Sequence, residues 1–153
     1  MREEEVQEII KNWFKGRSFE VLENIQIDSE NKVEVDLIAK KGNEEWIIEV
    51  KGDYDRNTAQ YNVNFDTGMG QILKSITTLN NEIRYAICIP FSRTERGEKL
   101  SYRLILKKYS KSIVFEVLNI HVILVRDDES VEVIPPKDVR AFLRNIEPKI
   151  RAR

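Results

Sequence analysis

The chain has 153 residues, of which 41% are hydrophobic and 33% charged, and its formal net charge is −1. This length suits one domain around one core, so we expect residues 1–153 to form a single domain. Its apolar stretches are too short to cross a membrane, and its acidic amphipathic start is unlike a signal or transit peptide. Its one cysteine excludes a disulfide framework and a Cys-rich zinc site. We therefore expect a cytoplasmic location.

The apolar pattern in the first third of the chain predicts a helix followed by three strands. The helix is expected where apolar residues recur at helical spacing, and Gly16 ends it. The four elements are expected over residues 3–15, 19–27, 32–39 and 45–51. A short turn at 40–43 joins the last two strands as a hairpin.

A polar stretch, residues 52–67, follows the hairpin and shows no clear period, so it is interpreted as a loop over one end of the sheet. Tyr54, Tyr61 and Phe65 within it either stack on bases or hold the loop in place. The remaining pattern predicts helices over 68–79 and 98–109, buried strands over 85–89 and 120–125, an edge strand over 131–134 and a last helix after Pro136. The order, roughly α-β-β-β-α-β-α-β, predicts an α/β fold with a mixed central β-sheet flanked by helices.

The predicted hairpin brings charged residues together on one face. If Gly42 and Asn43 are its two turn residues, the numbers of paired positions add to 85. This register places three pairs on one face: Asp36 with Glu49, Glu34 with Lys51, and Ile38 with Ile47. Two opposed carboxylates repel each other unless a cation lies between them, and Mg²⁺ is commonly held by one or two carboxylates. The alternative is a solvated sheet face, because Glu-x-Lys alone is common in so charged a chain.

The hairpin resembles the PD-(D/E)XK nuclease superfamily, which has the restriction endonuclease-like fold. The resemblance is carried by Val35-Asp36 in the second strand, by Glu49-Val50-Lys51 in the third, and by the order of the elements. A further shared feature is Gly70-Gln71 in the next predicted helix, and the resemblance covers roughly residues 3–126. Val35 replaces the proline of the motif name, and Ser75 stands where some branches carry tyrosine.

This resemblance implies a role for each motif residue. Asp36 and Glu49 would ligate Mg²⁺, for which Mn²⁺ is the expected substitute, and the Val50 carbonyl is a further candidate ligand. Lys51 would position or activate the attacking water, and Gln71 would touch the metal-bound water or the nucleic-acid backbone. The chemistry would be metal-assisted hydrolysis of a phosphodiester.

An acidic residue of the first helix often completes the site in this superfamily. The candidates are Glu5 and Glu8, and Glu5 is preferred because its spacing to Gly16 is similar to that in junction-resolving relatives. The alternative for both is a solvated acid at a helix start.

Several other residues have two interpretations. Arg93, Arg96 and Arg103 follow the predicted fourth strand and are candidates for nucleic-acid contact, with a solvated helix face as the alternative. The only histidine, His121, is expected in the core or at a strand edge rather than in catalysis, and Cys88 is expected in the core.

The sequence therefore favours a Mg²⁺-dependent phosphodiesterase, a DNA endonuclease for which a homodimer would allow both strands to be cut. Its near-neutral charge argues mildly against a DNA-coating protein. Two other functions stay open: a non-catalytic nucleic-acid-binding or assembly module on the same fold, and a nuclease that acts on RNA.

Overall fold

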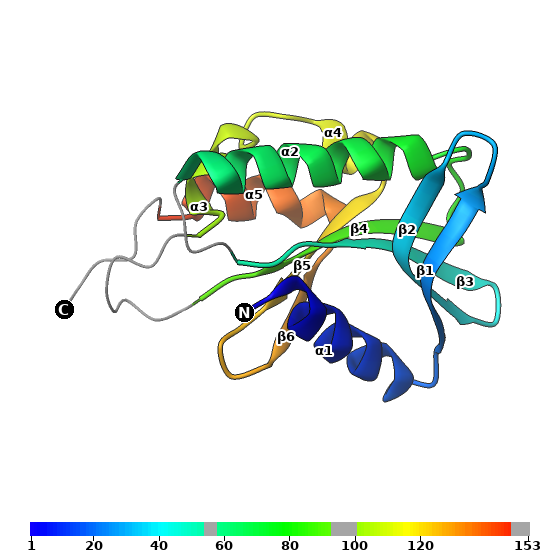
Figure 1. The fold of residues 1–153 in the computed structure, drawn as a ribbon. Helices are drawn as coiled ribbons and strands as arrows, with labels where there is room; N and C mark the ends of the chain where they lie inside the picture. Colours follow the sequence, from blue (N-terminus) through cyan, green and yellow to red (C-terminus); the bar gives the residue numbers. More distant parts are fainter. Residues whose placement is uncertain (54–57, 93–100, 148–153) are drawn as a thin grey trace.

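The computed structural model describes residues 1–53, 58–92 and 101–147. They form a six-stranded mixed sheet flanked by helices (Figure 1), which confirms the predicted α/β class. The helices are α1 (Glu3–Lys15), α2 (Thr58–Ser75), α3 (Arg103–Lys108), α4 (Val114–Val117) and α5 (Pro136–Asn145). The strands are β1 (Glu20–Asp28), β2 (Val33–Lys41), β3 (Glu44–Val50), β4 (Ile83–Pro90), β5 (Ile120–Val125) and β6 (Val131–Ile134).

The six strands lie in the sheet in the order of the sequence. The first three form an antiparallel meander, β3, β4 and β5 run parallel, and β6 returns antiparallel to β5. The central strands β4 and β5 are almost wholly apolar because helices or other elements cover both of their faces. The carboxyl ends of the parallel strands therefore meet at one edge, where β3 ends at Val50.

Two hydrophobic cores hold the layers together. One lies between α1 and the sheet, and the other lies between the opposite face and helices α2 to α5 (Figure 1). Val6, Ile10 and Phe14 of α1 are fully buried because their spacing places them on one side of the helix. A Cβ at Gly52 would lie only 2.3 Å from the backbone nitrogen of Glu3, so the start of α1 packs directly on the end of β3.

The prediction of a loop over 52–67 is wrong for most of this range, because α2 begins at Thr58. The helix predicted over 68–79 therefore starts earlier than expected, and it also ends earlier, at Ser75. Asparagine, threonine and glycine are weak helix formers and hide its period. Tyr61 and Phe65 nevertheless precede Met69 at helical spacing, and both are buried in the core. They are therefore not available to stack on bases, and Tyr54 lies outside the described residues.

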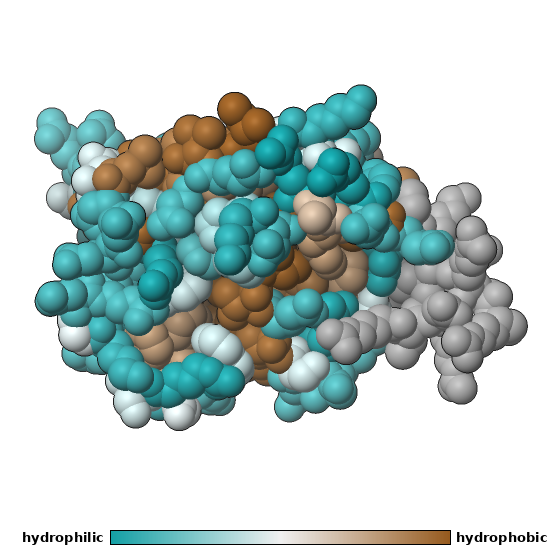
Figure 2. All heavy atoms as spheres, turned by 180° about the vertical axis from the view of Figure 1, so that it is seen from behind, coloured by the Kyte–Doolittle hydropathy of each residue, from teal (hydrophilic) through white to brown (hydrophobic). Residues whose placement is uncertain are grey.

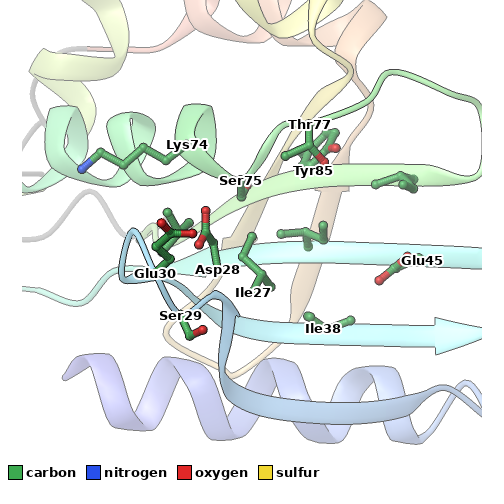
Figure 3. Close-up of a pocket in the computed structure, with 13 residues that line it drawn as sticks. Ile27, Asp28, Ser29, Glu30, Ile38, Glu45, Lys74, Ser75, Thr77 and Tyr85 are labelled. Atoms are coloured by element: carbon green, nitrogen blue, oxygen red, sulfur yellow. The ribbon is translucent and has the colours of Figure 1, made fainter.

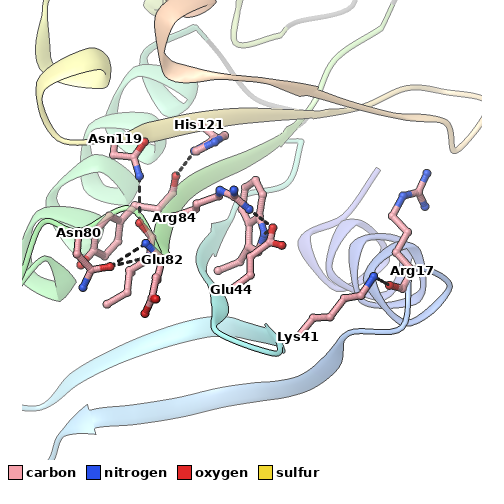
Figure 4. Close-up of polar contacts among 11 residues, drawn as sticks. Arg17, Lys41, Glu44, Asn80, Glu82, Arg84, Asn119 and His121 are labelled. Carbon is pink, nitrogen blue, oxygen red and sulfur yellow. Dashed lines mark hydrogen bonds and ion pairs between the residues drawn. The ribbon is translucent and has the colours of Figure 1, made fainter.

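The edge where the parallel strands begin is closed by polar contacts (Figure 4). The Nδ1 atom of His121 lies 3.2 Å from the Tyr85 carbonyl oxygen, and its ring packs against Trp46. Burial lowers the pKa of His121 to about 4, so the ring is neutral in the folded protein. Of the two positions expected for His121, the core or a strand edge, the structure shows a buried one, and the expected core position of Cys88 is confirmed.

The surface mixes hydrophilic and hydrophobic residues. Seen from behind, hydrophobic side chains are exposed in a band between hydrophilic ones (Figure 2). The largest exposed fractions among the described hydrophobic side chains belong to Val63, Ile113 and Val117. Within the described part of the chain, no helix is both long and apolar enough to span a membrane.

Candidate active site

The β2–β3 hairpin has the predicted register and then opens. Gly42 takes a positive φ of 59° in the turn. In every pair of the ladder, from Lys41 with Glu44 to Leu37 with Ile48, the two residue numbers add to 85. The ladder ends there, so the next pair, Asp36 and Glu49, is not joined by strand pairing. The expected pairing of Glu34 with Lys51 is not formed, because the ladder between β2 and β3 ends before it; Glu34 is exposed and pairs only with Gln26 of β1.

The opening of the hairpin lets the Asp36 side chain take the place of a strand partner. Its Oδ2 atom accepts a hydrogen bond from the Val50 backbone N–H at 2.7 Å. The Lys51 N–H donates to Cys88 of β4, so the N–H and carbonyl of Val50 both face β2, because successive peptide groups alternate along a strand. The Val50 carbonyl thus points to the side on which Asp36 lies.

Glu49 and Lys51 project from the same face of β3 towards α2. Both side chains are buried, with exposed fractions of 4% and 7%, and the Lys51 Nζ lies 3.3 Å from Glu49 Oε1. Lys51 Nζ also donates a hydrogen bond to Gln71 Oε1 at 3.1 Å. Gly68, one turn before Gln71, leaves the space that Lys51 fills, since a Cβ there would lie 2.9 Å from Lys51 Cε. The structure therefore brings together Asp36, Glu49, Lys51 and Gln71 of the sequence-predicted site.

The cluster holds two carboxylates, of which Glu49 is buried and Asp36 is half-buried, beside one buried lysine. The pKa of Glu49 is raised to about 8, first by burial and then by the neighbouring Asp36 carboxylate, while Lys51 opposes both effects. One ammonium group offsets only one of the two carboxylates. The pair Asp36 and Glu49 therefore retains a net negative charge when both groups are ionised, which a cation would neutralise.

The acidic residue that α1 brings to the site is Glu3, and neither Glu5 nor Glu8 lies there. Glu5 accepts a hydrogen bond from the Arg2 backbone N–H at the helix start, and Glu8 is exposed beside Lys11. Burial raises the pKa of the Glu3 carboxyl, with Lys51 and Asp36 acting on it through their charges.

Sequence reasoning missed Glu3, although a signal for it was present. Glu3 precedes Val6 by three residues and Ile10 by seven, so it lies on the buried side of α1. Gln7 shares this side and was also missed, and its amide nitrogen lies 3.5 Å from the Asp36 backbone oxygen.

The donor set around Asp36 fits a hard divalent cation. Across residues 1–53, 58–92 and 101–147, no group of three or more His, Cys, Asp or Glu side chains is arranged to hold a metal ion. The cluster instead offers the carboxylates of Asp36 and Glu49 and the carbonyl of Val50, all oxygen ligands. Mg²⁺ often takes so few protein ligands, because it keeps several waters and binds substrate phosphate oxygens.

The arginines predicted to contact nucleic acid are accounted for only in part. Arg93 and Arg96 lie outside the described residues. The Arg103 guanidinium lies 4.2 Å from the Phe91 ring centre and donates to the backbone carbonyls of Ser92 and Glu147. Arg103 therefore links the end of β4 to the chain after α5, which is a structural role.

No family model, curated protein or solved structure matches the chain. The cluster consists of two carboxylates, a buried lysine and a glutamine, with Glu3 beside them.

Proposed function

We propose that this protein is a metal-dependent nuclease that hydrolyses phosphodiester bonds, with DNA as the substrate and internal positions as the cleavage sites. The observation that carries the proposal is the buried Lys51 on the same face of β3 as Glu49, with Asp36 bound to the peptide group between them. Asp36, Glu49 and Lys51 also have the order and spacing of the PD-(D/E)XK motif, so geometry and sequence support the same chemistry.

Asp36 and Glu49 would hold Mg²⁺, or Mn²⁺ in its place, with the Val50 carbonyl as a further ligand. When bound, the ion would polarise a phosphoryl oxygen and lower the pKa of a water molecule. A cation would stabilise the ionised form of the buried Glu49 beside the half-buried Asp36, two like charges that are unfavourable together. A carboxyl group whose pKa is shifted by burial and by a neighbouring charge is typical of functional sites.

Lys51 would orient the attacking water and offset the negative charge that develops on the phosphoryl group. Two oxygen atoms, one from Glu49 and one from Gln71, hold its ammonium group in place. Gln71 would thereby position Lys51, and its own amide N–H₂ group can donate to a phosphate or to water.

A second copy of the chain would allow both strands of a duplex to be cut by one small domain, so we propose a homodimer on DNA. This part of the proposal is separate from the chemistry of the site. Sedimentation of the protein with and without a DNA duplex tests it.

A cleavage assay with a panel of substrates tests the function. The substrates are supercoiled plasmid, linear duplex, single strands, a four-way junction and RNA, each with Mg²⁺, Mn²⁺ or Ca²⁺. We expect Mg²⁺- or Mn²⁺-dependent cutting by the wild type and loss of cutting in Asp36→Ala and Lys51→Ala. Preferred cutting of RNA would assign an RNA nuclease instead. No cutting by the wild type, or equal cutting by all three proteins, would overturn the catalytic proposal and favour a binding module.

A further inference from the structure

A pocket of about 580 Å³ lies between the tip of the β1–β2 hairpin, the end of α2 and the sheet (Figure 3). Its apolar wall is formed by isoleucines, among them Ile38 of β2 and Ile47 of β3. Its rim carries the carboxylates of Asp28 and Glu30 and the ammonium group of Lys74. Ile27 in this pocket is 38% exposed, so part of the apolar wall is open to solvent.

The pocket adjoins the candidate active site on three elements at once. Ile38 follows Asp36 by two residues on β2, Ile47 precedes Glu49 by two on β3, and Ser75 follows Gln71 by one helical turn on α2. Residues two apart on a strand point to the same face and lie about 7 Å apart. This separation is comparable to the spacing of successive nucleotides in an extended strand.

The chemistry of the pocket excludes a phosphate group and fits a planar base. Carboxylates of Asp28, Glu30 and Glu45 line it, and they would repel an anion. The backbone and side-chain nitrogens of Asn31 donate hydrogen bonds of 3.1 and 2.8 Å to the Asp28 carboxylate and hold it in place. Carboxylate oxygens accept hydrogen bonds from exocyclic amino groups, and apolar walls pack against the faces of bases.

Lys74 supplies the one cation of the pocket lining. Its exposed side chain runs back along α2, towards the beginning of the helix (Figure 3). A phosphate that bridges two nucleotides beside α2 would therefore meet Lys74 while the base entered the pocket.

We propose that this pocket binds the unstacked base of the nucleotide next to the scissile phosphate, and that it selects a base with an amino group over thymine or uracil. This inference rests on the proposed nuclease function and adds a base-binding subsite to it. Unstacking a base costs a few kcal/mol, so single strands, ends and mismatches are the substrates in which this subsite is filled most readily.

Abasic substitution at each position around the cut tests the subsite. Removal of the base next to the scissile phosphate should raise KM about fivefold or more, because base packing is worth about 1–3 kcal/mol. Removal of bases farther along the strand should change KM less than twofold. At the sensitive position, cytosine, adenine or guanine should be cut faster than thymine.

A pocket variant provides a readout that does not depend on cleavage. Thr77→Trp places a large ring at the exposed rim, and Leu79→Trp is its control, because Leu79 is exposed but does not line the pocket. An oligonucleotide with 2-aminopurine at the sensitive position, bound in Ca²⁺, should fluoresce more strongly with the wild type and with Leu79→Trp. Thr77→Trp should abolish the increase.

The outcomes separate this inference from the nuclease function. Cleavage that is equally insensitive to every abasic position and to Thr77→Trp would overturn the base pocket and leave the nuclease intact. No cleavage of any unmodified substrate would overturn both.

Discussion

Among single residues, Glu49 shows most clearly that the site is not built for stability. The residue is 4% exposed and lies beside Asp36, and burial together with that charge raises the pKa of its carboxyl group to about 8. The same group in the unfolded chain has an ordinary pKa of about 4.5. Folding at neutral pH therefore requires either proton uptake by Glu49 or a cation beside it.

Replacing Glu49 with the neutral isostere glutamine should stabilise the metal-free protein. In EDTA near neutral pH, we expect Glu49→Gln to raise the free energy of unfolding by about 2 kcal/mol, because glutamine removes the cost of protonating Glu49 or of burying its charge beside Asp36. Urea unfolding measures this change. Glu34→Gln is the matched control, because Glu34 is an exposed residue of β2 and its replacement should leave the free energy of unfolding unchanged. Mg²⁺ should raise the Tm of the wild type but not of Glu49→Gln. A destabilised Glu49→Gln would show that the glutamate serves the fold.

His121 should make the protein less stable in acid. Its pKa is lowered to about 4 in the folded protein, against an ordinary value of 6.5. Between pH 6.5 and pH 4, the unfolded chain therefore binds a proton at His121 that the folded protein does not. The contribution of His121 to stability is complete above pH 6.5 and is lost as the pH falls towards 4. We expect the wild type to lose about 2 kcal/mol more than His121→Gln between pH 7 and pH 4.5 in urea unfolding. Parallel losses in the two proteins would contradict the buried neutral histidine.

Among the helices, α2 positions Lys51, because Gly68 on its sheet-facing side leaves space for the lysine side chain. The Cβ of Gly68→Ala would meet the flexible end of Lys51, so we expect the fold to persist and Lys51 to move. Cleavage should fall about tenfold or more in Gly68→Ala, since small displacements of catalytic groups are costly. Gly70→Ala is the control, because nothing lies within 4 Å of its added Cβ, and it should stabilise the helix by about 0.5–1 kcal/mol with activity retained. Circular dichroism and the cleavage rate measure both effects, and equal rates for the two variants would contradict the proposed packing.

The sequence allowed some elements to be predicted well because their signals are local. The Gly42-Asn43 turn determines the register of β2 and β3, and this register places Asp36 and Glu49 at neighbouring positions. The start of α2 was missed because its first turns are rich in asparagine and only Tyr61 and Phe65 mark its buried side. The pairing of Glu34 with Lys51 failed because the hairpin opens before it, which no local pattern reveals.

At the scale of the whole molecule, the site exists because elements distant in sequence meet at the carboxyl end of β3. Helix α1 packs on Gly52, β2 contains Asp36, and α2 contains Gln71, and these residues meet beside Val50 and Lys51. Periodicity identifies which side of α1 is buried, but it does not say which strand that side covers. Glu3 could therefore be placed on the buried side from the sequence, whereas its position beside Lys51 required the folded structure.

The catalytic role of the cluster is tested by the metal dependence of cleavage in the wild type and three variants, Asp36→Asn, Lys51→Met and Glu34→Gln. The first two replacements approximately preserve the size of the side chain but remove a carboxylate ligand or the ammonium group. The third is the control, since Glu34 is an exposed acid on the same strand as Asp36. On the preferred substrate, we predict Mg²⁺-dependent cleavage by the wild type and Glu34→Gln and a loss of about 100-fold or more in the other two proteins. Folded Asp36→Asn and Lys51→Met proteins that cut at the wild-type rate would contradict a catalytic role for this cluster.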